Sequence, residues 1–195
     1  MPDDPHRLPT GVVPNRYDLE IAPDLAAASF DGTVAIAVDV LEPTDEIVLN
    51  GLELTVANAW VERGGRRVEA GAHVDDEAER ITLSLAEPVP VGAATVGLEF
   101  TGVLNDKLVG FYRSTFETDD GTEHNLAATQ MEATYARQAF PCWDEPAAKA
   151  VFAITLVVAD DLVAVSNAGE ISREPTGDGR VRICFADTIA MSTYL

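Results

Sequence analysis

Short segments in which polar and apolar residues alternate recur along most of the chain. Residues 16–22 (RYDLEIA) and 33–40 (TVAIAVDV) show this alternation, and turn-forming pairs such as Pro23-Asp24 and Asp31-Gly32 bound them. Successive side chains of a strand point to opposite faces, so this period predicts half-buried β-strands. Similar stretches predict further strands at residues 46–51, 54–62, 80–85, 95–100, 110–117, 151–159, 162–167, 170–173 and 181–186.

Turn signals separate these segments and limit the helical content. Gly64-Gly65 and Asp120-Gly121 are dipeptides typical of tight hairpins. The alanines of residues 133–140 favour a helix, but Pro141 and Pro146 restrict it to a single short turn. Many short strands at regular spacing, with at most one short helical turn near 133–140, predict an all-β sandwich or a similar antiparallel architecture.

Composition narrows the class of protein. The chain has 195 residues and 47% hydrophobic content, which favours one large domain over two small ones. Its 13 Lys and Arg stand against 33 Asp and Glu, for a formal net charge of -20. Nucleic-acid binding needs clustered cations, so we expect no nucleic-acid partner. The acids are scattered, which is typical of a solvated surface and, as a weaker alternative, of a high-salt habitat.

The sequence offers no membrane or export signal. Residues 1–11 (MPDDPHRLPTG) carry acids and prolines where a secretory signal would carry basic and then apolar residues. The longest apolar run, residues 151–159, is too short to span a bilayer. We therefore expect a cytoplasmic protein with no membrane partner. Cys142 and Cys184 are far apart and outside any CxxC motif, so two reduced thiols are expected, with a disulfide left open.

A metal site is not expected within this chain. The three histidines, His6, His73 and His124, are widely separated, and none has a second histidine four residues on. The HExxH type of zinc site needs two histidines on one helical face together with a glutamate. Each histidine is therefore interpreted as a surface residue.

Residues 129–146 (TQMEATYARQAFPCWDEP) hold the densest group of reactive side chains. On an extended backbone Gln130 and Glu132 share one face while Met131 points to the other. A carboxylate beside an amide is suited to bind a free ammonium group. The alternative is a polar strand face with no ligand.

Arg137, Asp144 and Glu145 form a second candidate cluster. Adjacent carboxylates on turn backbone diverge, so Asp144 and Glu145 cannot act as an acid/base pair across one bond. They are expected instead to cap a helix end or to pair with Arg137. Three aromatic residues are expected to anchor this loop in the core, with a pocket wall left open for the second: Phe140, Trp143 and Phe152.

Residues 129–146 resemble the N-terminal-domain signature of the M1 family of zinc aminopeptidases, related to aminopeptidase N. In that family a Gln-x-Glu pair is followed by Ala-Arg and by a Phe-Pro-Cys-Phe/Trp-Asp-Glu-Pro box. Tyr135 departs from the family pattern, which has an acid or a small residue there. Weaker matches in the correct order extend the resemblance over nearly the whole chain, at residues 12–21, 47–54, 110–114, 149–155 and 165–169.

The resemblance implies a curved, saddle-like antiparallel β-sandwich that contributes to peptide hydrolysis. Gln130 and Glu132 match the pair that anchors the substrate α-amino group. The zinc cofactor would be bound by a C-terminal catalytic domain of the same polypeptide, since neither HExxH nor the family's Gly-x-Met-x-Asn segment occurs here. Peptide substrates are the implied partners.

We accordingly expect residues 1–195 to be the N-terminal β domain of a metalloaminopeptidase, inactive by itself. Residues 189–195 (IAMSTYL) look like the start of a strand, which suggests truncation at the last strand. The main alternative is a non-catalytic M1-like scaffold or interaction domain. An unrelated β-sandwich that binds carbohydrate or mediates adhesion would fit the strand pattern, but it gives no reason for residues 129–146.

Overall fold

The structure is a computed structural model that describes residues 7–195. The expectations for His6 and for the first six residues lie outside the described residues. Within residues 7–195 there are thirteen strands and one short 3-10 helix. They are β1 (Val12–Asp24), β2 (Ser29–Val40), β3 (Thr44–Asn50), β4 (Leu54–Arg63), β5 (Arg66–Glu69), β6 (Gly71–Asp75), β7 (Arg80–Val89), β8 (Gly92–Val103), β9 (Gly110–Glu117), β10 (Glu123–Gln130), η1 (Ala136–Gln138), β11 (Val151–Ala159), β12 (Glu170–Pro175) and β13 (Arg180–Phe185).

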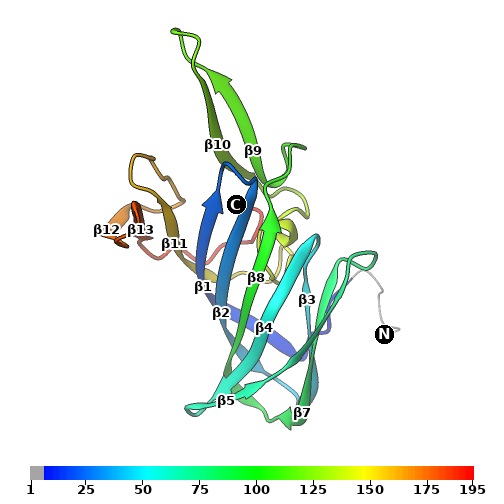
Figure 1. Cartoon of the computed structure of the whole chain (residues 1–195). Helices are drawn as coiled ribbons and strands as arrows, with labels where there is room; N and C mark the ends of the chain where they lie inside the picture. The colour runs from blue at the N-terminus through cyan, green and yellow to red at the C-terminus, as the bar shows by residue number, and fades with distance from the viewer. Residues whose placement is uncertain (1–6) are drawn as a thin grey trace.

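The strands form three sheets. The largest has the order β12-β13-β11-β1-β2-β8-β4-β5, and a three-stranded sheet has the order β3-β7-β6. β9 and β10 pair with each other as a two-stranded hairpin. Figure 1 shows this hairpin projecting beyond the end of the two larger sheets.

The two larger sheets bury their facing sides in one core. Val34 and Ile36 of β2 are completely buried, as are Ile81 and Leu83 of β7, and all four belong to the same hydrophobic cluster. Each such side chain contributes about 1.5–3 kcal/mol when it is fully removed from water. The alternation read from residues 33–40 is therefore the inward and outward alternation of β2.

The predicted all-β fold with packed antiparallel sheets is confirmed, as is a single short helical turn within residues 133–140. The Gly64-Gly65 hairpin is also confirmed. Both glycines have positive φ, 59° and 77°, the conformation that a two-residue hairpin turn requires. One pair departs from the antiparallel prediction: β1 and β11 run parallel, from Arg16 beside Val151 to Ile21 beside Leu156.

Two strand predictions are wrong. Residues 162–167 have no regular secondary structure. Their alternation is real, because Leu162 and Ala164 pack against a small core cluster while Val163 and Val165 are exposed. No strand in the described part of the chain lies alongside to pair with them.

Residues 189–195 also do not form a strand: only Met191 pairs, in an isolated bridge with Ala150. Conversely, β6 was not predicted, since a five-residue segment GAHVD that begins with glycine and ends with aspartate has a weak strand signal.

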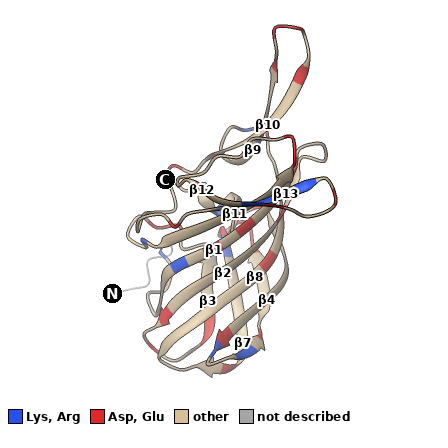
Figure 2. Ribbon diagram, turned by 90° about the vertical axis from the view of Figure 1, so that its left-hand side faces the viewer, with Lys and Arg blue, Asp and Glu red and all other residues tan. Residues whose placement is uncertain are grey.

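Acidic residues are spread over strands and loops, including the β9–β10 hairpin, as the red segments of the ribbon in Figure 2 show. The only helix in residues 7–195 is the three-residue η1, so no helix there is long enough to cross a membrane.

Candidate functional site

The candidate site lies where the β9–β10 hairpin joins the sandwich. β10 ends at Gln130, which pairs with Gly110 at the start of β9. The chain then turns, and the Tyr135 amide donates to the Met131 carbonyl at 2.9 Å. The peptide bond between Glu132 and Ala133 within this turn is cis.

Gln130 and Glu132 are both exposed, whereas Met131 between them is half-buried against the core. This exposure pattern matches an extended segment whose first and third side chains point away from the protein. Among residues 7–195 neither the Gln130 amide nor the Glu132 carboxylate has a hydrogen bond or an ion pair with another side chain. Their polar atoms are therefore available to a ligand.

Gly110 allows the close approach of the hairpin to η1. Its φ is +66°, and a Cβ there would lie 2.9 Å from both the Cβ and the Oε1 of Gln138. Gln138 is buried and donates from Nε2 to Glu53 Oε2 at 3.2 Å, while its Oε1 has no partner among the described residues. Gly110 therefore determines how closely the base of the hairpin packs against η1, and so where its pairing partner Gln130 lies.

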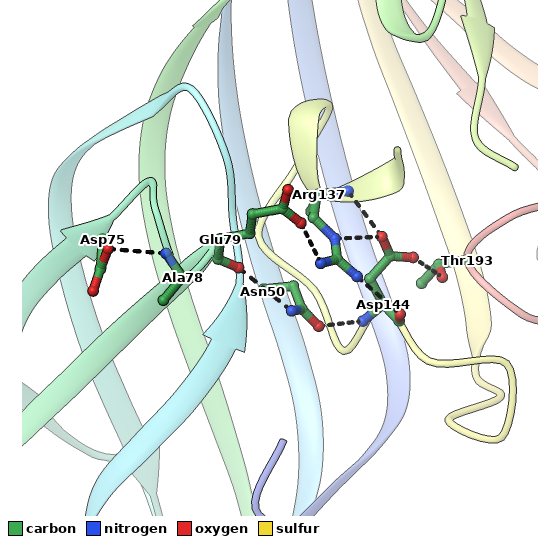
Figure 3. A network of polar contacts seen from close by, with 7 residues as sticks. All are labelled: Asn50, Asp75, Ala78, Glu79, Arg137, Asp144 and Thr193. Carbon is green, nitrogen blue, oxygen red and sulfur yellow. Dashed lines mark hydrogen bonds and ion pairs between the residues drawn. The ribbon is translucent and has the colours of Figure 1, made fainter. Parts of the chain in front are cut away.

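Arg137 is the centre of a polar network that holds the turn to the sandwich (Figure 3). Its Nε donates to Asp144 Oδ2 at 2.9 Å, and its Nη1 donates to Glu79 Oε2 at 2.7 Å. The other carboxylate oxygen of Asp144 accepts from Thr193 Oγ1 at 2.7 Å, and the Asp144 amide donates to Asn50 Oδ1 at 3.0 Å. Three distant parts of the chain thus meet at one turn.

The ion pair is almost completely enclosed. The side chain of Asp144 is 1% exposed and that of Arg137 is 12% exposed. Burial by itself lowers the pKa of Arg137, but the hydrogen bonds and charges of Asp144 and Glu79 outweigh it and raise the pKa above its usual value. Arg137 therefore stays charged. The carboxylate of Asp144 is too buried to contact a substrate, so its role is structural.

Glu145 faces elsewhere: its Oε1 accepts from the Leu8 amide at 2.8 Å. Asp144 and Glu145 thus do not flank a common point, as the sequence predicts, and of the two it is Asp144 that pairs with Arg137.

An aromatic cluster anchors the same loop. Phe140, Trp143 and Phe152 are all buried, so the predicted anchor is confirmed. Tyr17 stacks on Phe152 with ring centroids 4.8 Å apart, and its hydroxyl accepts from the Trp143 amide at 3.1 Å. Burial raises the pKa of Tyr17 well above its usual value, so the phenol stays neutral. Trp143 Nε1 has no acceptor among the described residues.

Residues 13–195 match the family model described as the peptidase M1 N-terminal domain. The chain belongs to the peptidase M1 family. It is 45% identical over 194 residues to "Aminopeptidase M1" of Arabidopsis thaliana, an alignment that covers 97% of this chain and 22% of that protein. It is also 40% identical over 192 residues to "Puromycin-sensitive aminopeptidase" of Caenorhabditis elegans, covering 97% of this chain and 20% of the relative.

A third relative of this M1 domain is "Endoplasmic reticulum aminopeptidase 1" of Rattus norvegicus, 35% identical over 199 residues, covering 97% of this chain and 21% of the relative. The chain therefore spans about a fifth of the length of the curated relatives it matches. Its similarity to aminopeptidases concerns their N-terminal domain.

The described residues of this M1 domain do not fit a zinc site: no group of three or more His, Cys, Asp or Glu side chains there could hold a metal ion. His73 and His124 are exposed, as predicted for surface residues. Cys142, which is buried, and Cys184, which is half-buried, are free thiols.

Sequence reasoning missed three partners in the M1 signature. Asn50, Glu79 and Thr193 all contact the 137–144 turn, from 94, 58 and 49 residues away in the chain. Glu79 lies in the turn before β7 with a positive φ of 55°. No sequence signal singled out these three residues, because each contact joins segments that are far apart in the chain.

Proposed function

We propose that this chain is the N-terminal domain of a zinc-dependent metalloaminopeptidase that releases N-terminal amino acids from peptides, and that Gln130 and Glu132 anchor the substrate α-amino group. The observation that carries the proposal is the pairing of an exposed carboxylate and an exposed amide on either side of the half-buried Met131, neither of which has a side-chain partner among residues 7–195. The names of the aminopeptidase relatives support the reaction class.

The N–H donors of the substrate's α-ammonium group determine which protein groups can recognise it. An α-ammonium group has three N–H donors, and the Glu132 carboxylate with the Gln130 carbonyl oxygen can accept them. A charge-assisted hydrogen bond contributes about 1.5–3 kcal/mol, which corresponds to roughly ten- to a hundredfold in affinity. An internal peptide nitrogen has neither the charge nor the three donors, so the site would select chain ends.

The zinc ion belongs to another part of the whole polypeptide in this proposal, because the described residues of this chain offer no ligand set for it. Such an ion supplies Lewis-acid activation when bound. This chain would bind and orient the amino end of the peptide, and its rigid Arg137–Asp144 turn would keep the anchor in place.

The cytoplasm is the proposed compartment. The two free cysteines, Cys142 and Cys184, suit a reducing environment, in which disulfides are rare. Fractionation of cells that express the whole polypeptide tests this: recovery in a secreted or luminal fraction would contradict it.

The function is tested with the whole polypeptide and two matched substrates, an aminoacyl chromogenic amide and its N-acetylated form. We expect turnover of the first, loss of that turnover on treatment with a chelator, and no turnover of the acetylated form, which has lost the ammonium. Equal turnover of both forms would overturn the role of the anchor, and an inactive whole polypeptide would overturn the reaction class.

A further inference from the structure

The β9–β10 hairpin has one face that continues directly from Gln130. Residues directly opposite each other in an antiparallel pair share a face, and Gln130 lies opposite Gly110. Every second pair along the hairpin is on the same side. The Gln130 face therefore carries Tyr112, Ser114 and Phe116 of β9 with His124, Leu126 and Ala128 of β10.

At its base this face lies against η1, where Gly110 approaches Gln138, and beyond that base it points away from the core of the sandwich. The opposite face makes the contacts to the core: Phe111 is buried with its ring centroid 5.2 Å from that of Phe30, and Ala127 packs against the same cluster. Arg113 on that opposite face donates from Nη1 to the Leu25 carbonyl at 2.9 Å. Alternation then turns the Gln130 face outward.

The outward face is the more apolar of the two beyond the hairpin base. Phe116 is 46% exposed and Leu126 is 38% exposed. The rings of Phe116 and His124 stack with centroids 5.3 Å apart. On the other face the neighbouring pair is polar, Thr115 with Asn125. A solvated hairpin would present the reverse pattern, so an exposed apolar face of this kind indicates a binding surface.

β10 also has a free backbone edge. In the part of the chain that the structure describes, β9 is the only strand that pairs with β10. The other edge of β10 leaves main-chain donors and acceptors for an extended peptide, which is the chemistry of binding by strand addition. A peptide with its amino end at Gln130 would run antiparallel to β10, toward Glu123.

We propose that the β9–β10 hairpin binds the peptide substrate beyond its first residue, as an added strand along β10 whose apolar side chains contact Leu126 and Phe116. The inference rests on the proposed function, because it takes the amino end of the peptide to be held at Gln130 and Glu132. The surface is continuous with that anchor, which is why a peptide is its occupant.

The length of the hairpin sets the class of substrate. His124 and Phe116 lie six residues along the strands from the Gln130–Gly110 pair, or about 20 Å at 3.4 Å per residue. An extended peptide covers that distance with about six residues. The hairpin therefore favours peptides of about seven residues or more over dipeptides, with large apolar side chains at position five, opposite Leu126, and at position seven, opposite His124.

The test uses the whole polypeptide and two peptides with the same first two residues, a dipeptide amide and an octapeptide with leucine at position five and phenylalanine at position seven. The measured quantity is the ratio of kcat/KM for the octapeptide to that for the dipeptide. We expect Phe116→Ala combined with Leu126→Ala to lower this ratio about five- to tenfold, mainly through KM. The matched control, Thr115→Ala combined with Asn125→Ala on the opposite face, should leave the ratio unchanged.

An unchanged ratio in the Phe116 and Leu126 double variant would overturn the proposal, as would an equal fall in the control. A fall in thermal stability with no change in the ratio would show that another part of the polypeptide covers the face, and would also overturn it. The role of Gln130 and Glu132 as the anchor is tested separately, by turnover of the N-acetylated substrate. A wrong assignment of the anchor is therefore distinguishable from a wrong assignment of the hairpin surface. A whole polypeptide that hydrolyses neither peptide would overturn both.

Discussion

The guanidinium of Arg137 binds both the side chain and the backbone of Asp144. Arg137 Nε donates to Asp144 Oδ2 at 2.9 Å, and Arg137 Nη2 donates to the Asp144 carbonyl oxygen at 3.3 Å. A planar guanidinium with several donors in a fixed fork can make both bonds at once, which a lysine cannot. The six residues between them are thereby closed into a rigid turn, and that turn follows directly on the segment that carries Gln130 and Glu132.

Breaking this pair should destabilise the domain strongly. Asp144→Asn removes the charge that compensates Arg137 while keeping the shape of the side chain. Because the pair is enclosed, we expect a loss of about 3 kcal/mol or more in the free energy of unfolding, measured by urea denaturation. The matched control is Glu79→Gln, which removes the other acid on Arg137 from a side chain that is 42% exposed. There the loss should stay below about 1 kcal/mol, and equal losses in the two variants would contradict the prediction.

Gly110→Ala should destabilise the hairpin base. The new Cβ meets Gln138 at 2.9 Å, and the positive φ adds strain. Gly121→Ala at the hairpin tip is the control, since Gly121 has a positive φ of 82° but no neighbouring atom within 4 Å of the added Cβ. Backbone strain alone costs about 1–2 kcal/mol, so we expect that loss at Gly121 and a larger one at Gly110 in the same denaturation assay. If Gly110→Ala lost less unfolding free energy than Gly121→Ala, the prediction would be wrong, because η1 would then accommodate the added Cβ without destabilisation.

The sequence was sufficient wherever one face of a strand is buried. The alternation of residues 33–40 predicted β2 because each inward side chain meets the core. The pairing of Arg137 with an acid of the Asp-Glu-Pro box was also foreseeable, since the two lie seven residues apart on a turn. In both cases the information is local.

What the sequence could not provide depends on distant neighbours. Residues 162–167 alternate like a strand, yet strand formation needs a partner for the backbone, and the pattern of one segment says nothing about that. The same holds for the parallel pairing of β1 with β11, and for Asn50, Glu79 and Thr193 around the turn. That the face bearing Gln130 turns outward became clear only once Phe111 and Ala127 were seen on the core side.

The two thiols should differ in reactivity in the native protein. Burial, reinforced by the Asp144 charge, raises the pKa of Cys142 well above its usual value. Hydrogen bonds from Ser172 and Thr155 lower the pKa of Cys184, which is also half-exposed. The thiolate is the reactive form, so Cys184 gains reactivity at a lower pH and Cys142 stays protonated at pH 8.

Peptide mapping after brief treatment with iodoacetamide at pH 8 checks this. We expect alkylation of Cys184 and none of Cys142, and alkylation of both after unfolding in urea. Comparable labelling of the two thiols in the native protein would contradict the enclosed position of Cys142.

The 195-residue chain alone should have no peptidase activity. Its described residues can bind an ammonium but offer no metal ligand set. We expect no turnover of an aminoacyl chromogenic amide by the chain with zinc added. Chelator-sensitive turnover by the purified chain would contradict the division of labour between this domain and the rest of the polypeptide.

In the whole polypeptide, Glu132→Gln should lower kcat/KM for a short chromogenic substrate by roughly ten- to a thousandfold, which corresponds to about 1.4–4 kcal/mol of lost transition-state binding. The variant keeps the size and exposure of the side chain, so folding is not the cause of the loss. Glu123→Gln is the matched control: it removes an exposed carboxylate from the far end of β10 and should leave kcat/KM unchanged. An equal effect of the two variants would point to the general acidity of the surface, since distant charges act alike on a cationic substrate. A loss confined to Glu132→Gln would instead require direct contact between that carboxylate and the amino end of the peptide.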